Sequence, residues 1–167
     1  KYLESNNKIN TTEYTFFFFF LGLIYFRKED YKKAEGYYQI ELFTLIKLFG
    51  ENYSSLQYTF SFLGRINENL GDYKQSESFY LRAISNVKAN LGEKKPNYSL
   101  CLLNLATLYK KNKEYQKAEP LYLEAIENKK LNFGENSIEY QRALISYAIF
   151  YDEKGDLQKA DELFFKS

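Results

Sequence analysis

The side chains that most often carry out chemistry in proteins are scarce in this sequence. Its 167 residues include no histidine and one cysteine, Cys101. Without histidine the chain can form neither a Ser-His-Asp nor a Cys-His nucleophilic site, and it lacks the ligands of a Cys/His zinc cluster. Cys101 lies in an apolar run from Leu100 to Leu103, which favours a small buried thiol over a reactive one. A single cysteine also excludes an internal disulfide, and we expect no cofactor and no metal.

Carboxylate pairs are the remaining candidates for acid–base chemistry. Three glutamates, Glu51, Glu93 and Glu135, each follow a glycine and recur at a constant interval along the chain. This regular spacing favours a structural role at a turn, with the three carboxylates about one structural unit apart. We therefore expect a protein that is not an enzyme.

Charge and hydropathy narrow the classes of partner. The chain has 23 Lys and Arg residues and 22 Asp and Glu residues, which gives a net charge of +1. It therefore has no excess of positive charge that would attract nucleic acid or an anionic membrane. Its longest apolar stretch, Phe16–Phe26, is about half the roughly 20 residues that a transmembrane helix needs. We expect neither a nucleic-acid nor a membrane partner, and a cytoplasmic location.

An internal repeat runs through the chain without a gap. One column of the repeat holds a glycine at Gly50, Gly92 and Gly134, which defines a 42-residue period. A second column holds a tyrosine at Tyr38, Tyr80 and Tyr122. A third holds a leucine followed by a small residue, which is Gly22, Gly64 or Ala106. The same succession of local structures is therefore expected in each repeat.

Each repeat contains two apolar stretches of helical period separated by a short polar turn. In the second repeat this turn contains Gly71, which suits a left-handed helix end, and Asp72, which suits the N-cap of the following helix. Ser54 followed by Gln57 predicts a capping box at the start of the first helix of that repeat. These signals predict one helical hairpin in each repeat.

The small residues and tyrosines of the repeat predict how the hairpins pack. Gly22 and Gly64 would let two helices approach closely, with Tyr38 and Tyr80 filling the space beside them. Because one hairpin cannot bury both of its apolar faces, neighbours must stack, with the first helices lining a concave surface. We expect an all-α fold, a right-handed α-solenoid of about four hairpins. The expected repeats are approximately 12–53, 54–95, 96–137 and 138–167, in a single domain, and the absence of an initiator Met indicates a segment of a longer protein.

These residues resemble a known repeat family. The segment Leu105–Tyr109, then Tyr115, then the segment Lys117–Ala125 is similar to the tetratricopeptide repeat. The 42-residue period, with Gly92 and Pro96 before the next helix, resembles the kinesin light chain variety. The resemblance implies a scaffold that binds a protein or peptide ligand in its concave groove. Two alternatives remain open, namely a regulatory arm of a larger enzyme such as a caspase-like peptidase or a kinase, and a structural stack that mediates self-assembly.

The resemblance also implies a role for one amide. Kinesin light chain repeats carry an asparagine immediately before the Leu-Ala pair, and its side chain grips the backbone of an extended peptide. The matching residue here is Asn104, whereas Phe20, Phe62 and Ser146 occupy the equivalent positions, so a regular ladder of amides is not expected. The carboxylate clamp of Hsp90-type repeats is rejected because Leu23 and Phe62 break its pattern.

Helical spacing aligns a mixed row of aromatic, amide and basic side chains along successive first helices. This groove row consists of Tyr58, Phe62, Arg65, Asn69, Leu100, Asn104, Thr107, Lys111, Arg142 and Ser146. Such a surface suits a peptide with apolar anchors and some acidic character. The alternative for each residue is contact with a neighbouring hairpin or with solvent, and Asn104 is the leading single candidate.

Five consecutive phenylalanines, Phe16–Phe20, cover every side of the expected first helix. Part of such an apolar end is normally covered. We expect an adjacent repeat or domain to pack on these residues, with a self-association or ligand patch as the alternative. The last helix, expected from about Asp156 to Ser167, is shorter than its counterpart that starts near Asp72, so both ends are expected to be truncated.

Overall fold

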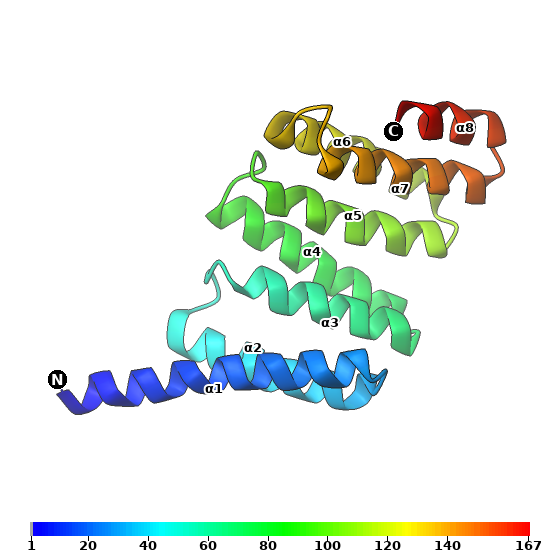
Figure 1. Cartoon of the computed structure of the whole chain (residues 1–167). Helices are drawn as coiled ribbons and strands as arrows, with labels where there is room; N and C mark the ends of the chain where they lie inside the picture. The colour runs from blue at the N-terminus through cyan, green and yellow to red at the C-terminus, as the bar shows by residue number, and fades with distance from the viewer. Residues whose placement is uncertain (1) are drawn as a thin grey trace. The chain divides into compact units, whose positions relative to one another are not determined.

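The computed structural model consists of helical hairpins joined by short loops (Figure 1). It describes the backbone of residues 2–167 and the side chains from residue 13 onward. The described part contains no strand. Its helices are α1 Tyr2–Arg27, α2 Tyr31–Phe49, α3 Leu56–Leu70, α4 Tyr73–Asn90, α5 Pro96–Lys111, α6 Tyr115–Phe133, α7 Ile138–Lys154 and α8 Leu157–Lys166.

The helices fall into two compact units, Lys1–Asn90 and Leu91–Ser167. In the first unit α1 pairs with α2 and α3 with α4, and α2 also packs against α3. In the second unit α5 pairs with α6 and α7 with α8, and α6 packs against α7. The predicted hairpins are therefore confirmed within each unit, while the grouping of all repeats into a single domain stays a prediction.

The turn between α3 and α4 has the predicted chemistry. Gly71 has φ 82° and ψ 5°, the left-handed conformation that ends a helix without strain only in glycine. Asp72 Oδ1 accepts a hydrogen bond from the backbone N–H of Gln75 at 3.0 Å, which caps α4. In the first and third hairpins Glu29 and Lys113 take the equivalent position with φ 60° and 61°, so glycine is not required there.

The capping box predicted at Ser54 and Gln57 is wrong. The helix starts at Leu56, its N-cap is Ser55, and the side chain of that N-cap accepts no backbone hydrogen bond. Gln57 therefore lies one position too early in the helix to form the box, and its side chain is buried. The first turn is closed by the backbone instead, with Leu56 N donating to Tyr53 O at 3.1 Å.

The predicted close approach of the two helices in a hairpin is confirmed. A Cβ atom added to Gly64 would lie 2.5 Å from Cε1 of Tyr80, and one added to Gly22 would lie 2.7 Å from Cε2 of Tyr38. Both tyrosines are completely or almost completely buried. The missing side chain is thus what lets a buried aromatic ring lie against the facing helix backbone.

Two asparagines that sequence reasoning did not single out fasten the loops between hairpins. Asn86 Nδ2 donates to the carbonyl oxygen of Tyr53 at 3.1 Å, and Asn128 Nδ2 donates to that of Glu93 at 2.6 Å. The two asparagines occupy the same position in successive repeats, and each bonds a carbonyl of the loop before its own hairpin, although the accepting residues are two positions apart in the repeat. Each loop is consequently held by the second helix of the hairpin that follows it.

Two further expectations concern single features. Cys101 is buried, as predicted. Among the described residues, no helix is both long and apolar enough to cross a membrane.

Candidate functional site

The groove row is distributed over three helices and both units. Tyr58, Phe62, Arg65 and Asn69 lie on α3 in the first unit. The other six lie in the second unit, four on α5 (Leu100, Asn104, Thr107 and Lys111) and two on α7 (Arg142 and Ser146). All ten side chains are exposed or half-buried, which keeps them available to a ligand. That they line one common groove stays a prediction.

In the first unit, part of the groove row holds the hairpins together. The Phe62 ring stacks on the Tyr38 ring with centroids 5.0 Å apart and planes 9° from parallel, and it also meets Phe19 edge-on. The Arg65 guanidinium lies 4.8 Å from the centroid of the Phe26 ring. Phe62 is therefore mainly a packing residue, whereas Tyr58 is 47% exposed.

Several polar side chains of the groove row are bonded to their own helix. Asn69 Nδ2 donates to the carbonyl of Arg65 at 2.7 Å, Thr107 Oγ1 to that of Leu103 at 2.8 Å, and Ser146 Oγ to that of Arg142 at 2.9 Å. Binding a ligand through these donors would require breaking an existing hydrogen bond. They are weaker candidates than the spacing alone suggested.

Asn104 differs from several other asparagines in the described helices. Its side chain is half-buried on α5, and its amide forms no hydrogen bond within the described part of the chain. By contrast, the amides of Asn67, Asn86 and Asn128 all donate to partners within their units. An amide held on a rigid helix with unused donors and acceptors can bind a peptide backbone.

A cavity of about 290 Å³ in the first unit was not predicted from the sequence. Its walls are mostly aromatic and come from α1, the end of α2, and the start of α3 with the loop before it. From α1 and α2 they include Thr15, Phe16, Phe19, Phe20, Glu41, Leu45 and Phe49. The loop and α3 add Tyr53, Ser55 and Tyr58. Tyr58 thus belongs both to this aromatic cavity and to the groove row.

Among the described residues that line the aromatic cavity, Glu41 is the one with a carboxyl group. Its side chain is only 5% exposed, and its Oε2 has no hydrogen-bond partner among the side chains from residue 13 onward or the described backbone. Burial raises the pKa of the Glu41 carboxyl to about 8, opposed in part by the nearby Thr59 hydroxyl. The signal in the sequence was that Glu41 stands in the column that holds Ala83 and Ala125 in later repeats.

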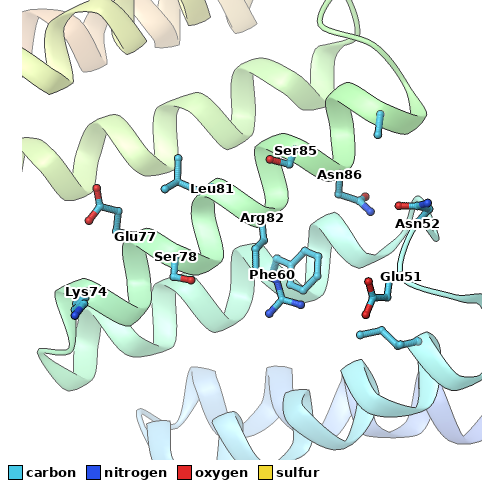
Figure 2. Close-up of a pocket in the computed structure, with 12 residues that line it drawn as sticks. Glu51, Asn52, Phe60, Lys74, Glu77, Ser78, Leu81, Arg82, Ser85 and Asn86 are labelled. Carbon is cyan, nitrogen blue, oxygen red and sulfur yellow. The ribbon is translucent and has the colours of Figure 1, made fainter.

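A wider hollow of about 720 Å³ lies along α4 (Figure 2). Figure 2 shows Arg82 of α4 beside Phe60 of α3, and the guanidinium lies 4.2 Å from the ring centroid. The nearby Asn86 amide is bonded to the loop carbonyl of Tyr53. Since the hollow is wide and open and its lining mixes Lys74, Arg82 and carboxylates, it offers less for recognition than the aromatic cavity.

Several solved structures have folds similar to that of this chain. Crystal structures of similar shape include BtubC (BKLC) from P. vanneervenii, with a TM-score of 0.78 and 23% identity over 87% of this chain. They also include two of a Podosopora anserina putative kinesin light chain with nearly identical TPR-like repeats, with TM-scores of 0.75 and 0.73 and 16% identity over 87% of this chain. The chain spans 57% of the BtubC structure and 69% of each of the others.

No match was found among curated proteins. The all-α repeat fold predicted from the sequence is confirmed, in the variety seen in kinesin light chain-like repeats. The profile of the Tetratricopeptide repeat family matches residues 53–131 and 102–166, which together make up more than half of the sequence. This chain therefore belongs to the tetratricopeptide repeat family.

Proposed function

We propose that this chain is a scaffold that binds a peptide or protein partner through the exposed faces of α3, α5 and α7, and that it is not an enzyme. Tetratricopeptide repeats are generally protein-interaction modules, and the groove row mixes apolar anchors with hydrogen-bonding groups. The observation that carries the proposal is the Asn104 amide, which is half-buried on α5 and forms no hydrogen bond in the described structure.

The groove row also suggests the chemistry of the partner. Leu100 is 50% exposed on the helical turn before Asn104, so a peptide bonded to this amide would cover an apolar side chain at the same time. Lys111 and Arg142 are exposed basic residues on α5 and α7 and would favour some acidic character in the ligand. The net charge of +1 argues against a nucleic-acid partner.

The test compares two asparagines of the groove row whose amides differ in their hydrogen bonding. Asn104→Ala removes an amide without an internal partner, whereas Asn69→Ala removes an exposed amide that is already bonded to its own helix. We expect affinity capture followed by mass spectrometry to identify a partner that Asn104→Ala binds more weakly by about 1 kcal/mol, or fivefold. Asn69→Ala should weaken binding less than Asn104→Ala does, because the Asn69 amide is already bonded to the carbonyl of Arg65.

The result against the proposal would be a folded Asn104→Ala variant with unchanged partner affinity. A further variant, Arg65→Glu, probes the first unit, where a loss of binding would show that the partner also contacts α3. Nothing in the described part of the chain favours the alternative of a regulatory arm of an enzyme.

A further inference from the structure

We propose that the aromatic cavity around Glu41 binds the side chain of a lysine in the partner peptide, with its ammonium group against the Glu41 carboxylate. This inference deepens the proposed function and rests on it for the peptide that presents the lysine. It names a second anchor, located on the first unit, that the groove row did not predict.

The Glu41 carboxyl group has an unused hydrogen-bonding atom. A buried carboxyl oxygen without a hydrogen-bond partner is unfavourable in a folded protein, because its interactions with water are lost and not replaced. Glu41 Oε2 is such an atom, and it belongs to a residue that lines an open cavity. A donor that enters the cavity would satisfy it, and a lysine ammonium, a compact cation with three N–H donors at the end of a flexible stem, is suited to a carboxyl group that is this deeply buried.

The aromatic wall of the cavity suits the rest of a lysine side chain. Phe16, Phe20 and Tyr58 are 62%, 56% and 47% exposed, an unusual exposure for neighbouring aromatic rings of one unit. Aromatic ring faces attract a cation and also pack well against the methylene groups of a lysine stem. An apolar ligand alone would cover the rings but would leave the Glu41 oxygen unsatisfied, so the wall and the carboxyl together favour a lysine.

The cavity is also rigid and lies beside the expected peptide path. Phe49 stacks on Tyr53 with centroids 4.4 Å apart, and Phe19 packs edge-on against both Tyr38 and Phe62. Most of the wall is thus formed before a ligand arrives, which lowers the entropic cost of binding. Because Tyr58 also belongs to the groove row, a peptide lying along α3 could direct one side chain into the cavity.

The groups around Glu41 leave its carboxyl free to bind a cation. The other titratable groups that line the cavity or adjoin Glu41 are tyrosines: Tyr38 on α2, Tyr53 in the loop and Tyr58 on α3, while the described part of α1 contributes Thr15 and phenylalanines. The positive charge of Arg65 favours ionisation of Tyr38 and so lowers its pKa, but Arg65 is not among the residues that line the cavity. No described cation therefore competes with the ligand for Glu41.

The sign of the pH effect follows from proton release. With burial raising the pKa of Glu41 to about 8, the empty cavity holds a neutral carboxyl at pH 7. A lysine ammonium binds the ionised form, so each ligand displaces about one proton. The affinity should rise by up to about tenfold per pH unit below pH 8 and level off above it.

The experiment uses the full chain and a matched pair of capped tripeptides, Ac-Leu-Lys-Leu-NH₂ and the same peptide with norleucine in place of lysine. Binding is followed by NMR titration of the resonances of Thr15, Glu41 and Tyr58 at pH 6.5 and 7.5. For so small a probe we expect a dissociation constant on the order of millimolar. The lysine peptide should bind at least tenfold more tightly than the norleucine peptide, and more tightly at pH 7.5 than at pH 6.5.

The variant Glu41→Gln keeps the shape of the side chain and removes its charge. We expect it to bind the lysine peptide at least tenfold more weakly and to lose the pH dependence. Equal binding of the two peptides to the native chain would overturn the proposal without any variant, so a Glu41→Gln chain that fails to fold does not weaken the test. Hexylamine binding in the cavity while the lysine peptide does not bind would also overturn it, in favour of a free amine.

The outcomes separate this proposal from the one it rests on. Asn104 lies in the other unit, so a loss of partner binding in Asn104→Ala tests the scaffold function alone. If that function fails while the lysine peptide still binds the cavity with the expected pH dependence, the cavity is a lysine site and the groove row is not its peptide path.

Discussion

The first and third hairpins share one register of the repeat but differ in what they bury. In the first, Gly22 lies against Tyr38, whose Oη atom is buried without a partner, and Glu41 lies beside the aromatic cavity. In the third, Ala106 and Tyr122 take the first two positions, and the Tyr122 hydroxyl lies 3.4 Å from Thr107 Oγ1. Glu41 is replaced there by Ala125, which is completely buried.

The difference shows how a repeat fold can carry a site. The shared backbone supplies a rigid frame, and a single departure from one column places a buried carboxyl group in the wall of a cavity. The cost is local, because the two unsatisfied oxygens of Tyr38 and Glu41 both lie in the first unit. A site that reduces the stability of one hairpin can therefore be present while the other hairpin remains fully packed.

The largest effect is expected from exchanging the residues of this column. Ala125→Glu would place a carboxyl in a filled core without a partner, and we expect it to lower the free energy of unfolding by about 3 kcal/mol or more. The matched change Glu41→Ala should alter it by about 1 kcal/mol or less at pH 5, where the protonation of Glu41 adds little, because it removes an unsatisfied polar group and enlarges a cavity that already exists. Urea unfolding of both variants measures the contrast, and equal losses would remove the distinction between the two hairpins.

A second effect concerns pH and is specific to the first hairpin. Burial raises the pKa of Glu41 to about 8 in the folded chain, whereas an exposed glutamate in the unfolded chain has a pKa of about 4.3. Between these values the folded state binds more protons, so the contribution of Glu41 to stability is present at low pH and is lost as the pH rises towards 8. The loss should approach but not exceed about 1.4 kcal/mol per pH unit.

This pH effect is measured as the difference between the native chain and Glu41→Gln in urea unfolding from pH 5 to pH 8. We expect the native chain to lose stability relative to the variant across this range. If the free energies of unfolding of the two chains changed in parallel with pH, Glu41 would ionise as an exposed carboxyl does. The first and third hairpins would then differ at this position only in the volume of the side chain.

The smallest effect should come from the helix contact. Gly22→Ala introduces a Cβ 2.7 Å from Cε2 of Tyr38, whose ring is completely buried and is stacked on Phe62. Overpacking of about 1–3 kcal/mol is partly offset by the roughly 1 kcal/mol gain in helix propensity, so a net loss of about 1 kcal/mol is expected.

The converse change, Ala106→Gly in the third hairpin, should also destabilise by about 1 kcal/mol, because it lowers helix propensity without relieving a clash. Thermal unfolding of the two variants compares them directly. If Gly22→Ala stabilises the chain instead, the Tyr38 ring can shift, and the first hairpin is packed less tightly than its distances indicate.

Features that recur in successive repeats could be predicted from the sequence, and features that depend on a single departure could not. The hairpins, the contact of Gly64 with Tyr80 and the cap at Asp72 each follow from sequence signals that recur in more than one repeat. The capping box at Ser54 failed because its position depends on where the helix begins, and a shift of one residue removes it.

The aromatic cavity lay beyond prediction for a different reason. The sequence shows that Glu41 departs from the small residues of its column. It does not show that Glu41 lines a cavity, because the other walls come from α1 and from the loop before α3, for example from Thr15 and Tyr53. These residues belong to no shared column. The Asn104 amide was found from the family resemblance, and the structure adds that it forms no hydrogen bond to another described residue, while Asn69 does.

The asparagine contacts to the loops also bear on how the chain folds as it is synthesised. The carbonyl of Tyr53 can accept its hydrogen bond only after Asn86, 33 residues later, has been synthesised. The carbonyl of Glu93 likewise depends on Asn128, 35 residues later. At about 5–20 residues per second of ribosomal elongation, the first of these loops remains unfastened for roughly 2–7 s after it is made. Each of these two loops is therefore fastened only after the second helix of the hairpin that follows it has been made, and a pause of the ribosome within α4 would prolong the exposure of the loop that Asn86 closes.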